Sequence, residues 1–369
     1  MAKRDRIITY NAIKGLGAVG ILFSHMSYLA EGQNPFWRSF YNVFMSKGAV
    51  CTTLFVLCSG FFLNYSWKDK RFKDYIIGKL KRLYPLTVLV FLAALLVDIL
   101  LKGNGVVNET AVGSGQWFFN VCANLCLFKA FVPVESTFYS FHGPSWYVSL
   151  LFGFYLIAFP FMKGIRGNNR KRWLGIMGGV AAAAYSTELL ICVLAKIHNW
   201  PNLWLCYINP WFRIFGEGFA GILLCESMGG ITARIKNHGA LEWGALALFI
   251  GAFLIRNIKA NIMLAWIQII PMAFLLFAFR HGKGSAGWLL ARKPFQFLGD
   301  ISFELYMTHA FVYEGIPIIS GFVSGKLADW LIVHAGTRFV ITFIACIIVA
   351  WIVHVVMNWI NKTIVFRDK

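Results

Sequence analysis

A lysine and a histidine in the first hydrophobic segment share a spacing that could support acid–base chemistry. Lys14 and His25 are separated by ten residues in KGLGAVGILFSH. At about 100° per residue, this spacing puts both side chains on one helix face, about 16 Å apart along the axis. A neutral imidazole can take a hydroxyl proton, and ionisable groups at membrane depth are usually functional. The alternative is a lysine that reaches the lipid headgroups and a histidine bonded to a neighbouring helix.

A second polar group lies near the C-terminus, in GDISFELYMTHAF. Ser302, Tyr306 and His309 follow the spacing i, i+4, i+7 and form one polar stripe on a helix. Asp300 and Glu304 are also four residues apart. So many polar groups in one apolar helix favour a helix that lines a cavity. The alternative is a polar network that only holds helices together.

Two basic residues precede the third hydrophobic segment, in GKLKRLYPL. Lys79 and Arg82 are three residues apart, so both can point the same way if the helix starts early, and Pro85 fits a first helical turn. Such a pair could hold phosphate groups. The alternative is ordinary anchoring of a membrane helix by basic residues.

Two small residues interrupt the bulky helix LFVLCSGFFLNY. Ser59 supplies a hydroxyl, and Gly60 lets another backbone or a thin ligand come close. Packing between helices through small residues explains the same pair equally well.

The elements that must position these residues are membrane helices. The chain is 58% hydrophobic with 14% charged residues, and its mean hydropathy is +0.63. This composition indicates an all-α, polytopic transmembrane helix bundle. We predict ten spans, at 8–29, 42–63, 83–101, 145–162, 173–195, 208–228, 241–256, 261–279, 296–316 and 338–360.

The basic residues orient this bundle. With the N-terminus inside, the cytoplasmic segments hold 24 Lys and Arg and the external segments hold 10. The positive-inside rule then places both termini in the cytoplasm. The net charge of +19 follows mainly from this topology, so we expect no nucleic-acid binding. Residues 1–369 are predicted to form a single membrane domain.

Shorter features are interpreted as follows. The segment 117–128 is too short to span and is predicted to be interfacial or re-entrant. Ser145 is a plausible helix cap, and Trp146 and Tyr147 fit an interfacial aromatic belt. The spacing of Cys122 and Cys126 permits a disulfide but does not require one. No metal-ligand spacing occurs.

Taken together, these elements resemble the acyltransferase-three family of integral membrane O-acyltransferases, which includes bacterial O-acetylases of surface glycans. Four motifs carry the resemblance in chain order, across nearly the whole sequence. The matched positions are Lys14 and His25; Phe55, Ser59, Gly60 and Phe61; Lys79, Arg82 and Pro85; and Ser302, Tyr306 and His309.

The chain departs from the family pattern at two positions. Trp146 is kept in the fourth span, but Leu151 stands where many members have a glutamate, as in the branch with a "WYlsaL" motif. Glu304 replaces a residue that is usually small.

The resemblance implies an O-acyltransferase in the bacterial cytoplasmic membrane. Its donor would be acetyl-CoA or another acyl-CoA, and its acceptor an extracytoplasmic glycan or lipid-linked saccharide. Lys14, Lys79 and Arg82 would hold the donor phosphates, with Ser59 and Gly60 in the donor site. His25 would be the general base, with Tyr306, His309 or Ser302 stabilising the oxyanion.

Three alternatives remain open at this stage. The first is transfer of a succinyl or longer acyl group. The second is a secondary transporter of a small anionic solute, although no internal repeat is visible. The third is a lipid-glycan flippase or non-catalytic partner. The oligomeric state is not determined by the sequence.

Overall fold

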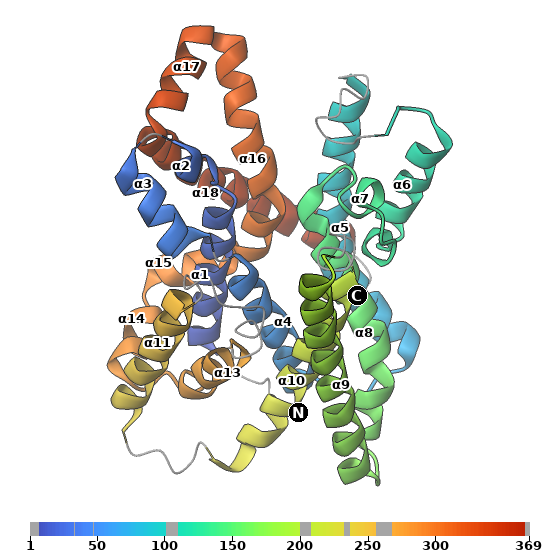
Figure 1. The fold of residues 1–369 in the computed structure, drawn as a ribbon. Coiled ribbons are helices and arrows are strands. Elements are labelled where there is room, and N and C mark those ends of the chain that lie inside the picture. Colours follow the sequence, from blue (N-terminus) through green and yellow to red (C-terminus); the bar gives the residue numbers. More distant parts are fainter. Residues whose placement is uncertain are drawn as a thin grey trace. The chain divides into compact units, whose positions relative to one another are not determined.

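The structure is a computed structural model, and it describes residues 7–32, 34–46, 48–100, 110–199, 208–231, 237–255 and 268–365. Every regular element in these ranges is a helix, which confirms the all-α prediction (Figure 1). The seven described cysteines, including Cys122 and Cys126, are free thiols.

Five helical stretches in the described ranges are long and apolar enough to cross a membrane. They are Pro35–Tyr65, Phe72–Leu100, Gly143–Gly164, Arg170–Ala195 and Ala335–Thr363. The other predicted spans correspond to shorter or less apolar helices: α1 (Ile8–Ser24), α10 (Asn209–Ile231), α11 (His238–Ile255), α13 (Ile269–Ala278), and α15 (Lys293–Asp300) followed by α16 (Ser302–Val323). The start of the predicted span 261–279 lies outside the described residues. The count of ten spans and the orientation of the termini stay predictions.

The third predicted span begins earlier than expected. Helix α5 runs over Phe72–Leu100, so Lys79 and Arg82 lie on the helix itself. Pro85 is therefore inside the helix and not in its first turn, which corrects the prediction. An internal proline removes one backbone hydrogen bond. The apolar residues on both sides of Pro85 nevertheless favour one continuous helix across the membrane.

Contacts between residues gather in two compact units. Unit 1 comprises Met1–Phe55 and Gly230–Lys369, and unit 2 comprises Val56–Gly229. The boundary falls inside helix α4 (Gly48–Tyr65). The prediction of one membrane domain is not tested by this division.

In unit 1, helix α1 packs closely on α15 and α16, and α16 packs on α18 (Ala335–Ile360). A side chain at Gly15 would lie 2.5 Å from the backbone nitrogen of Gly299, so only glycine permits this approach. One turn earlier, the Asn11 amide donates to the Asp300 carboxylate over 3.0 Å. Asp300 therefore helps to fix the relative position of α1 and α15.

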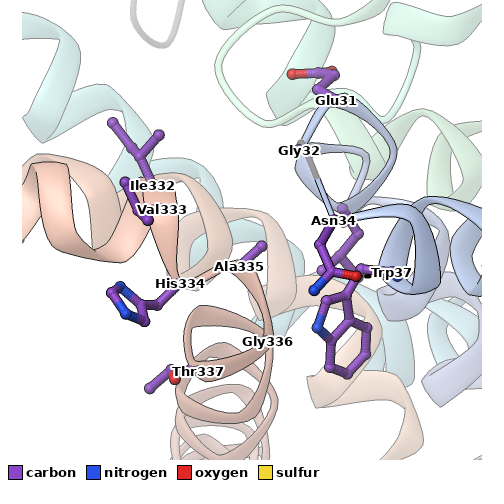
Figure 2. A pocket seen from close by; sticks show the side chains of 11 residues that line it. Glu31, Gly32, Asn34, Trp37, Ile332, Val333, His334, Ala335, Gly336 and Thr337 are labelled. Carbon is purple, nitrogen blue, oxygen red and sulfur yellow. Dashed lines mark hydrogen bonds between the residues drawn. The ribbon is translucent and has the colours of Figure 1, made fainter.

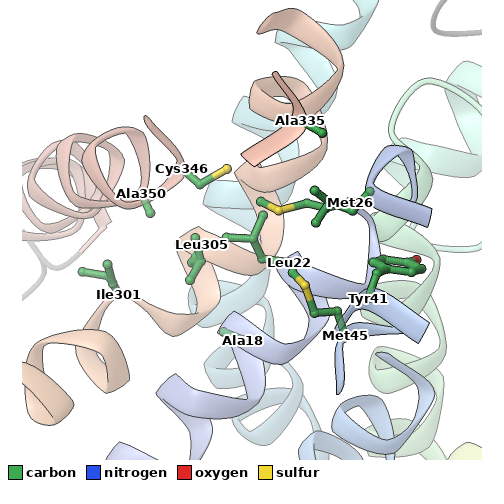
Figure 3. Packing of buried hydrophobic residues seen from close by; sticks show 11 residues of the cluster. Ala18, Leu22, Met26, Tyr41, Met45, Ile301, Leu305, Ala335, Cys346 and Ala350 are labelled. Atoms are coloured by element: carbon green, nitrogen blue, oxygen red, sulfur yellow. The ribbon is translucent and has the colours of Figure 1, made fainter. Parts of the chain in front are cut away.

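A hydrophobic cluster surrounds the C-terminal end of α1. Leu22 and Met26 are fully buried there together with Leu305 of α16 and Cys346 of α18. Figure 3 shows these side chains converging from the three elements. The cluster holds the end of α1 in a defined place beside α16.

In unit 2, the acidic residues of the membrane helices are paired. The Glu226 carboxylate lies 2.9 Å from Arg166 and 2.6 Å from Arg170. Arg213 lies 3.5 Å from Glu188 and 3.3 Å from Glu217. Charges in apolar surroundings need such partners, which favours a structural role for these acids.

The predicted short segment 117–128 contains helix α6 (Gly115–Leu125), which is too short to span. The indole nitrogen of Trp117 donates to the Asp98 carboxylate of α5 over 2.8 Å. In the following turn, the fully buried Lys129 donates to the carbonyls of Ser140 and His142. Burial lowers the pKa of the Lys129 ammonium well below its usual range. Lys129 is thus a structural residue of this segment and not a surface charge.

Gly60 of α4 makes the closest helix contact in unit 2. A Cβ atom there would overlap the carbonyl oxygen of Gly218 on α10. On the other side of the contact, a Cβ at Gly221 would overlap the Leu57 carbonyl. These approaches support helix packing through small residues as the role of Gly60.

We therefore expect Gly60→Ala to destabilise the protein by about 1–3 kcal/mol, because the added methyl forces α4 and α10 apart. Thermal unfolding in detergent would measure the loss. Gly178→Ala is the matched control, since a Cβ there meets nothing within 4 Å. Equal melting temperatures for the two variants would contradict the packing role.

Candidate active site

His25 stands at the end of helix α1. The helix closes at Ser24, and His25 keeps helical dihedral angles of −86° and −3°. Its side chain is exposed. The hydroxyl of Tyr41 donates to the Ser24 carbonyl over 2.6 Å, which fixes this end of the helix. Lys14 is half-buried on the same helix, eleven residues earlier.

His309 is the buried neighbour of His25. Its side chain has no exposed surface, and the two imidazole rings have their centroids 4.9 Å apart. His309 Nδ1 lies 2.7 Å from the Tyr306 carbonyl oxygen. A carbonyl only accepts hydrogen bonds, so Nδ1 carries the proton and the lone pair of the neutral ring is on Nε2. That Nε2 atom is buried and has no hydrogen-bond partner among the described residues.

Two tyrosines complete the surroundings of the histidine pair. The Tyr306 ring lies 5.9 Å from the His309 ring, and the Tyr313 ring lies 6.3 Å from the His25 ring. Tyr306 also contacts Phe55 of α4, at 6.4 Å between centroids. Tyr313 was not predicted, although it follows His309 by four residues and thus shares its helix face.

Ser302 does not join this group. Its hydroxyl donates to the Gly299 carbonyl over 2.9 Å, at the start of α16. His309 follows it by seven positions, which is about 10 Å along a helix. The three residues of the stripe therefore lie on one helix, but only Tyr306 and His309 belong to the surroundings of the histidine pair.

Glu304 points to a different partner. Its carboxylate lies 2.9 Å from His354 Nδ1 on α18, and His354 Nε2 lies 2.9 Å from the Asn358 amide. The residue that replaces a small one in the family pattern thus connects α16 to α18.

The histidine pair has the parts of an acid–base site. The exposed His25 can meet a substrate, and the buried His309 offers a lone pair beside it. No group of three His, Cys, Asp or Glu side chains suited to a metal occurs among the described residues.

Unit 2 holds a second candidate site, a pocket of about 310 Å³ at the start of α5. Lys79 and Arg82 line it, as the sequence predicts for a phosphate site, and they are joined by Lys68 and Lys70. No carboxylate is among its lining residues. The two additional lysines belong to the basic cluster KDKRFK, but the sequence does not show that this loop folds against α5.

Aromatic residues form the rest of this pocket. Trp67 and Tyr75 line it, with ring centroids 5.5 Å apart. The indole nitrogen of Trp67 is buried and has no hydrogen-bond partner in the described ranges. The Lys79 ammonium lies 4.1 Å from the centre of the Tyr155 ring, a cation–π contact.

Ser59 of α4 is a neighbour of Tyr155. Its side chain lies close to those of Tyr155 and Tyr147. Tyr147 is buried in unit 2, with 6% of its surface exposed. The prediction that Tyr147 belongs to an interfacial belt is wrong, because its side chain packs inside the protein and not at the membrane surface.

The neighbouring residues of the fourth span are placed as follows. Trp146 is half-buried and stacks on Phe138, with ring centroids 5.8 Å apart. Ser145 precedes helix α8 (Trp146–Gly164) but does not cap it with its side chain; its hydroxyl donates to the His142 carbonyl over 2.7 Å.

Comparison with known proteins identifies relatives of the whole chain. The family described as "Acyltransferase domain" matches residues 7–355. The protein "Acyltransferase MdmB" of Streptomyces mycarofaciens is 24% identical over 331 residues, which cover 84% of this chain and 80% of that protein. No solved structure shows a significant match.

The role of the buried His309 imidazole can be tested by substitution. In His309→Asn, the amide can still donate to the Tyr306 carbonyl, but the lone pair of Nε2 is lost. We expect its acyl transfer to fall at least 100-fold, the lower range for lost acid–base assistance, with an unchanged melting temperature. Unfolding in detergent and transfer of a radiolabelled acyl group would be measured on the same preparation.

His309→Ala is the companion variant, because it also removes the hydrogen bond to Tyr306. It should be inactive and melt at a lower temperature. Full activity in His309→Asn would show that His309 serves packing alone.

Proposed function

The chain belongs to the acyltransferase domain family, and on that premise we propose that it is an O-acyltransferase of the bacterial cytoplasmic membrane. It transfers an acetyl group from cytoplasmic acetyl-CoA to a hydroxyl of a carbohydrate or glycolipid on the other side. The observation that carries the proposal is the exposed His25 beside the buried, neutral His309. Family membership supports acyl transfer, and the apolar helices support a membrane location.

The donor's nucleotide is assigned to the pocket of unit 2. CoA carries a diphosphate and a 3′-phosphate, and the pocket offers Lys68, Lys70, Lys79 and Arg82 without an opposing lining acid. Trp67 supplies an aromatic surface for the adenine. Lys14 of α1 does not line this pocket, and its role as a phosphate ligand is proposed from the family motif alone.

The transfer itself is assigned to the histidine pair. His25 takes the proton of the acceptor hydroxyl as its oxygen attacks the thioester carbonyl. The tetrahedral intermediate expels the CoA thiolate, which takes the proton from His25. Tyr306 and Tyr313, whose rings lie beside the histidine pair, are the proposed donors to the oxyanion. Ser302 is less suited because its hydroxyl already donates to the Gly299 carbonyl.

His25→Gln tests the general base, since glutamine retains size and polarity without basicity. We expect turnover to fall by about 10²–10⁴-fold, with acetyl-CoA affinity within twofold of the wild type. Turnover of radiolabelled acetyl-CoA in proteoliposomes, and binding of a non-hydrolysable acetyl-CoA thioether, measure the two quantities. Near-normal turnover in His25→Gln would contradict the assignment of His25 as the general base.

Replacing both Lys79 and Arg82 by methionine tests the donor site. We expect acetyl-CoA affinity to drop at least tenfold, because two charge-assisted contacts are removed. Binding by the wild type should weaken with salt, and binding by the variant should depend less on salt. Isothermal titration in nanodiscs measures both effects.

Lys171→Met together with Arg172→Met on α9 (Arg170–Ile197) is the matched control. It removes the same charge from a cytoplasmic cluster that does not line the pocket. If the two double variants bind the donor equally, Lys79 and Arg82 are only anchors of the membrane helix.

A further inference from the structure

The largest space and the most basic surface of unit 1 are different places. A cavity of about 750 Å³ lies between residues 29–37 and residues 332–337, as Figure 2 shows. The charged side chain of its lining is an acid, Glu31, so the cavity does not suit an anion. Four basic side chains of the unit instead lie together beside helix α13.

These four side chains come from two parts of the chain. Arg280, His281 and Lys283 lie in the turn RHGKG between α13 and α14 (Ser285–Leu290). His238 is the first residue of α11, and its ring centroid lies 6.0 Å from that of His281. The other three groups all lie close enough to His281 to act on its charge. The four residues therefore form one electropositive group, which we call the RHGK cluster.

The RHGK cluster has buried nitrogen atoms without a hydrogen-bond partner. Within the described ranges, Nη1 of Arg280 and Nδ1 of His238 are both in this state. In the same ranges, no carboxylate forms an ion pair with Arg280 or Lys283. Basic residues that only anchor a membrane helix keep their charged ends in water. A buried guanidinium nitrogen instead needs an acceptor, which a bound ligand can supply.

The acid closest to the cluster along α11 has another role. Glu242 is fully buried, and its two oxygens accept from the backbone nitrogens of Gly284 and Gly287 over 2.8 and 2.7 Å. Its carboxylate thus caps the start of α14. The counter-charge for the RHGK cluster must then come from outside these residues.

The turn itself is held in a defined shape. Gly282 has a φ of +56°, in the left-handed region that favours glycine. A Cβ atom there would lie 2.5 Å from the Thr9 methyl carbon of α1, so the turn packs closely on that helix. The Thr9 hydroxyl also donates to the Phe279 carbonyl over 2.5 Å. A turn fixed in this way loses little conformational freedom when a ligand binds.

We propose that the RHGK cluster binds a phosphate group. Arginine and lysine are the usual phosphate ligands in proteins, and a protonated imidazole adds a further donor. With the predicted spans and orientation, the turn faces the cytoplasm. There a phosphate is available either on the headgroup of an anionic lipid or on a soluble ester. The proposal does not depend on acyl transfer.

The charge of His281 gives a direct measure of binding. Partial burial lowers the pKa of His281, and the neighbouring Arg280, Lys283 and His238 lower it further. The Glu242 carboxylate is bonded to backbone, and the contacting residue of α1 is an uncharged threonine. A bound phosphate offsets the repulsion, so the pKa of His281 should rise. Phosphate should accordingly bind more tightly as the pH falls through that pKa.

Two probes with the same phosphate ester separate the two sources. Glycerol 3-phosphate is soluble, whereas phosphatidic acid carries the same group on a lipid and is mixed into phosphatidylcholine nanodiscs that hold the full-length protein. The pKa of His281 is read by NMR of histidine-labelled protein and assigned with His281→Gln. We expect a rise of about one unit with at least one probe, together with a higher melting temperature. Sodium chloride at equal ionic strength controls for screening.

Two variants and one control localise the binding. Lys283→Gln and Arg280→Gln should each weaken binding of the effective probe at least about tenfold, because a charge-assisted contact is lost. Lys283 is exposed, so its variant keeps the test valid even if Arg280→Gln folds poorly. Lys293→Gln is the matched control: it removes one charge from an exposed residue at the start of α15, and Lys293 does not act on His281. It should bind the probe as the wild type does.

Each outcome decides the proposal. A rise with phosphatidic acid alone identifies a lipid headgroup, and a rise with both probes identifies a site that also takes soluble esters. No rise beyond that in sodium chloride, or an equal rise in Lys283→Gln, would overturn the phosphate site. Acetyl-CoA affinity should be unchanged in Lys283→Gln, and its loss would overturn the separation from the donor pocket. None of these measurements uses turnover, so acyl transfer by His25 is tested independently.

Discussion

The hydrogen bond between His309 Nδ1 and the Tyr306 carbonyl is the interaction on which the site depends. It fixes the tautomer of a fully buried imidazole and leaves the lone pair at Nε2. The ring of His25 lies 4.9 Å from the ring of His309, so the two imidazoles form a pair. The two rings can meet because α1 lies against α15 at Gly15, where a side chain would collide with backbone. The close approach at Gly15 thus helps to position His25, ten residues later.

The acidic groups of the helices obey a related physical constraint, since a buried charge needs a partner. Asp300, Glu304, Glu226, Glu188 and Glu217 each find an amide, an imidazole or a guanidinium. The His309 Nε2 atom and the Trp67 indole nitrogen are among the buried polar atoms that have no partner in the described ranges. Each lies in a candidate site, where a substrate can supply the missing hydrogen bond.

The two candidate sites also differ in character. The pocket of unit 2 is basic and aromatic, which matches a nucleotide with several phosphates. The histidine pair of unit 1 instead places two imidazole rings beside tyrosine rings, an arrangement that suits proton transfer.

By itself, the sequence determined the helical class and the membrane character, because composition and helical periodicity are local properties. It also predicted site residues that the structure brings near one another, namely His25, His309 and Tyr306 in one place and Lys79 and Arg82 in another. Periodicity tells which side chains share a face, but not which other helix that face meets. Only the tertiary structure therefore paired His25 with His309, separated Ser302 from them, and buried Tyr147. It likewise added Trp67 and the neighbouring lysines to the basic pair, since a loop's path depends on contacts far apart in the chain.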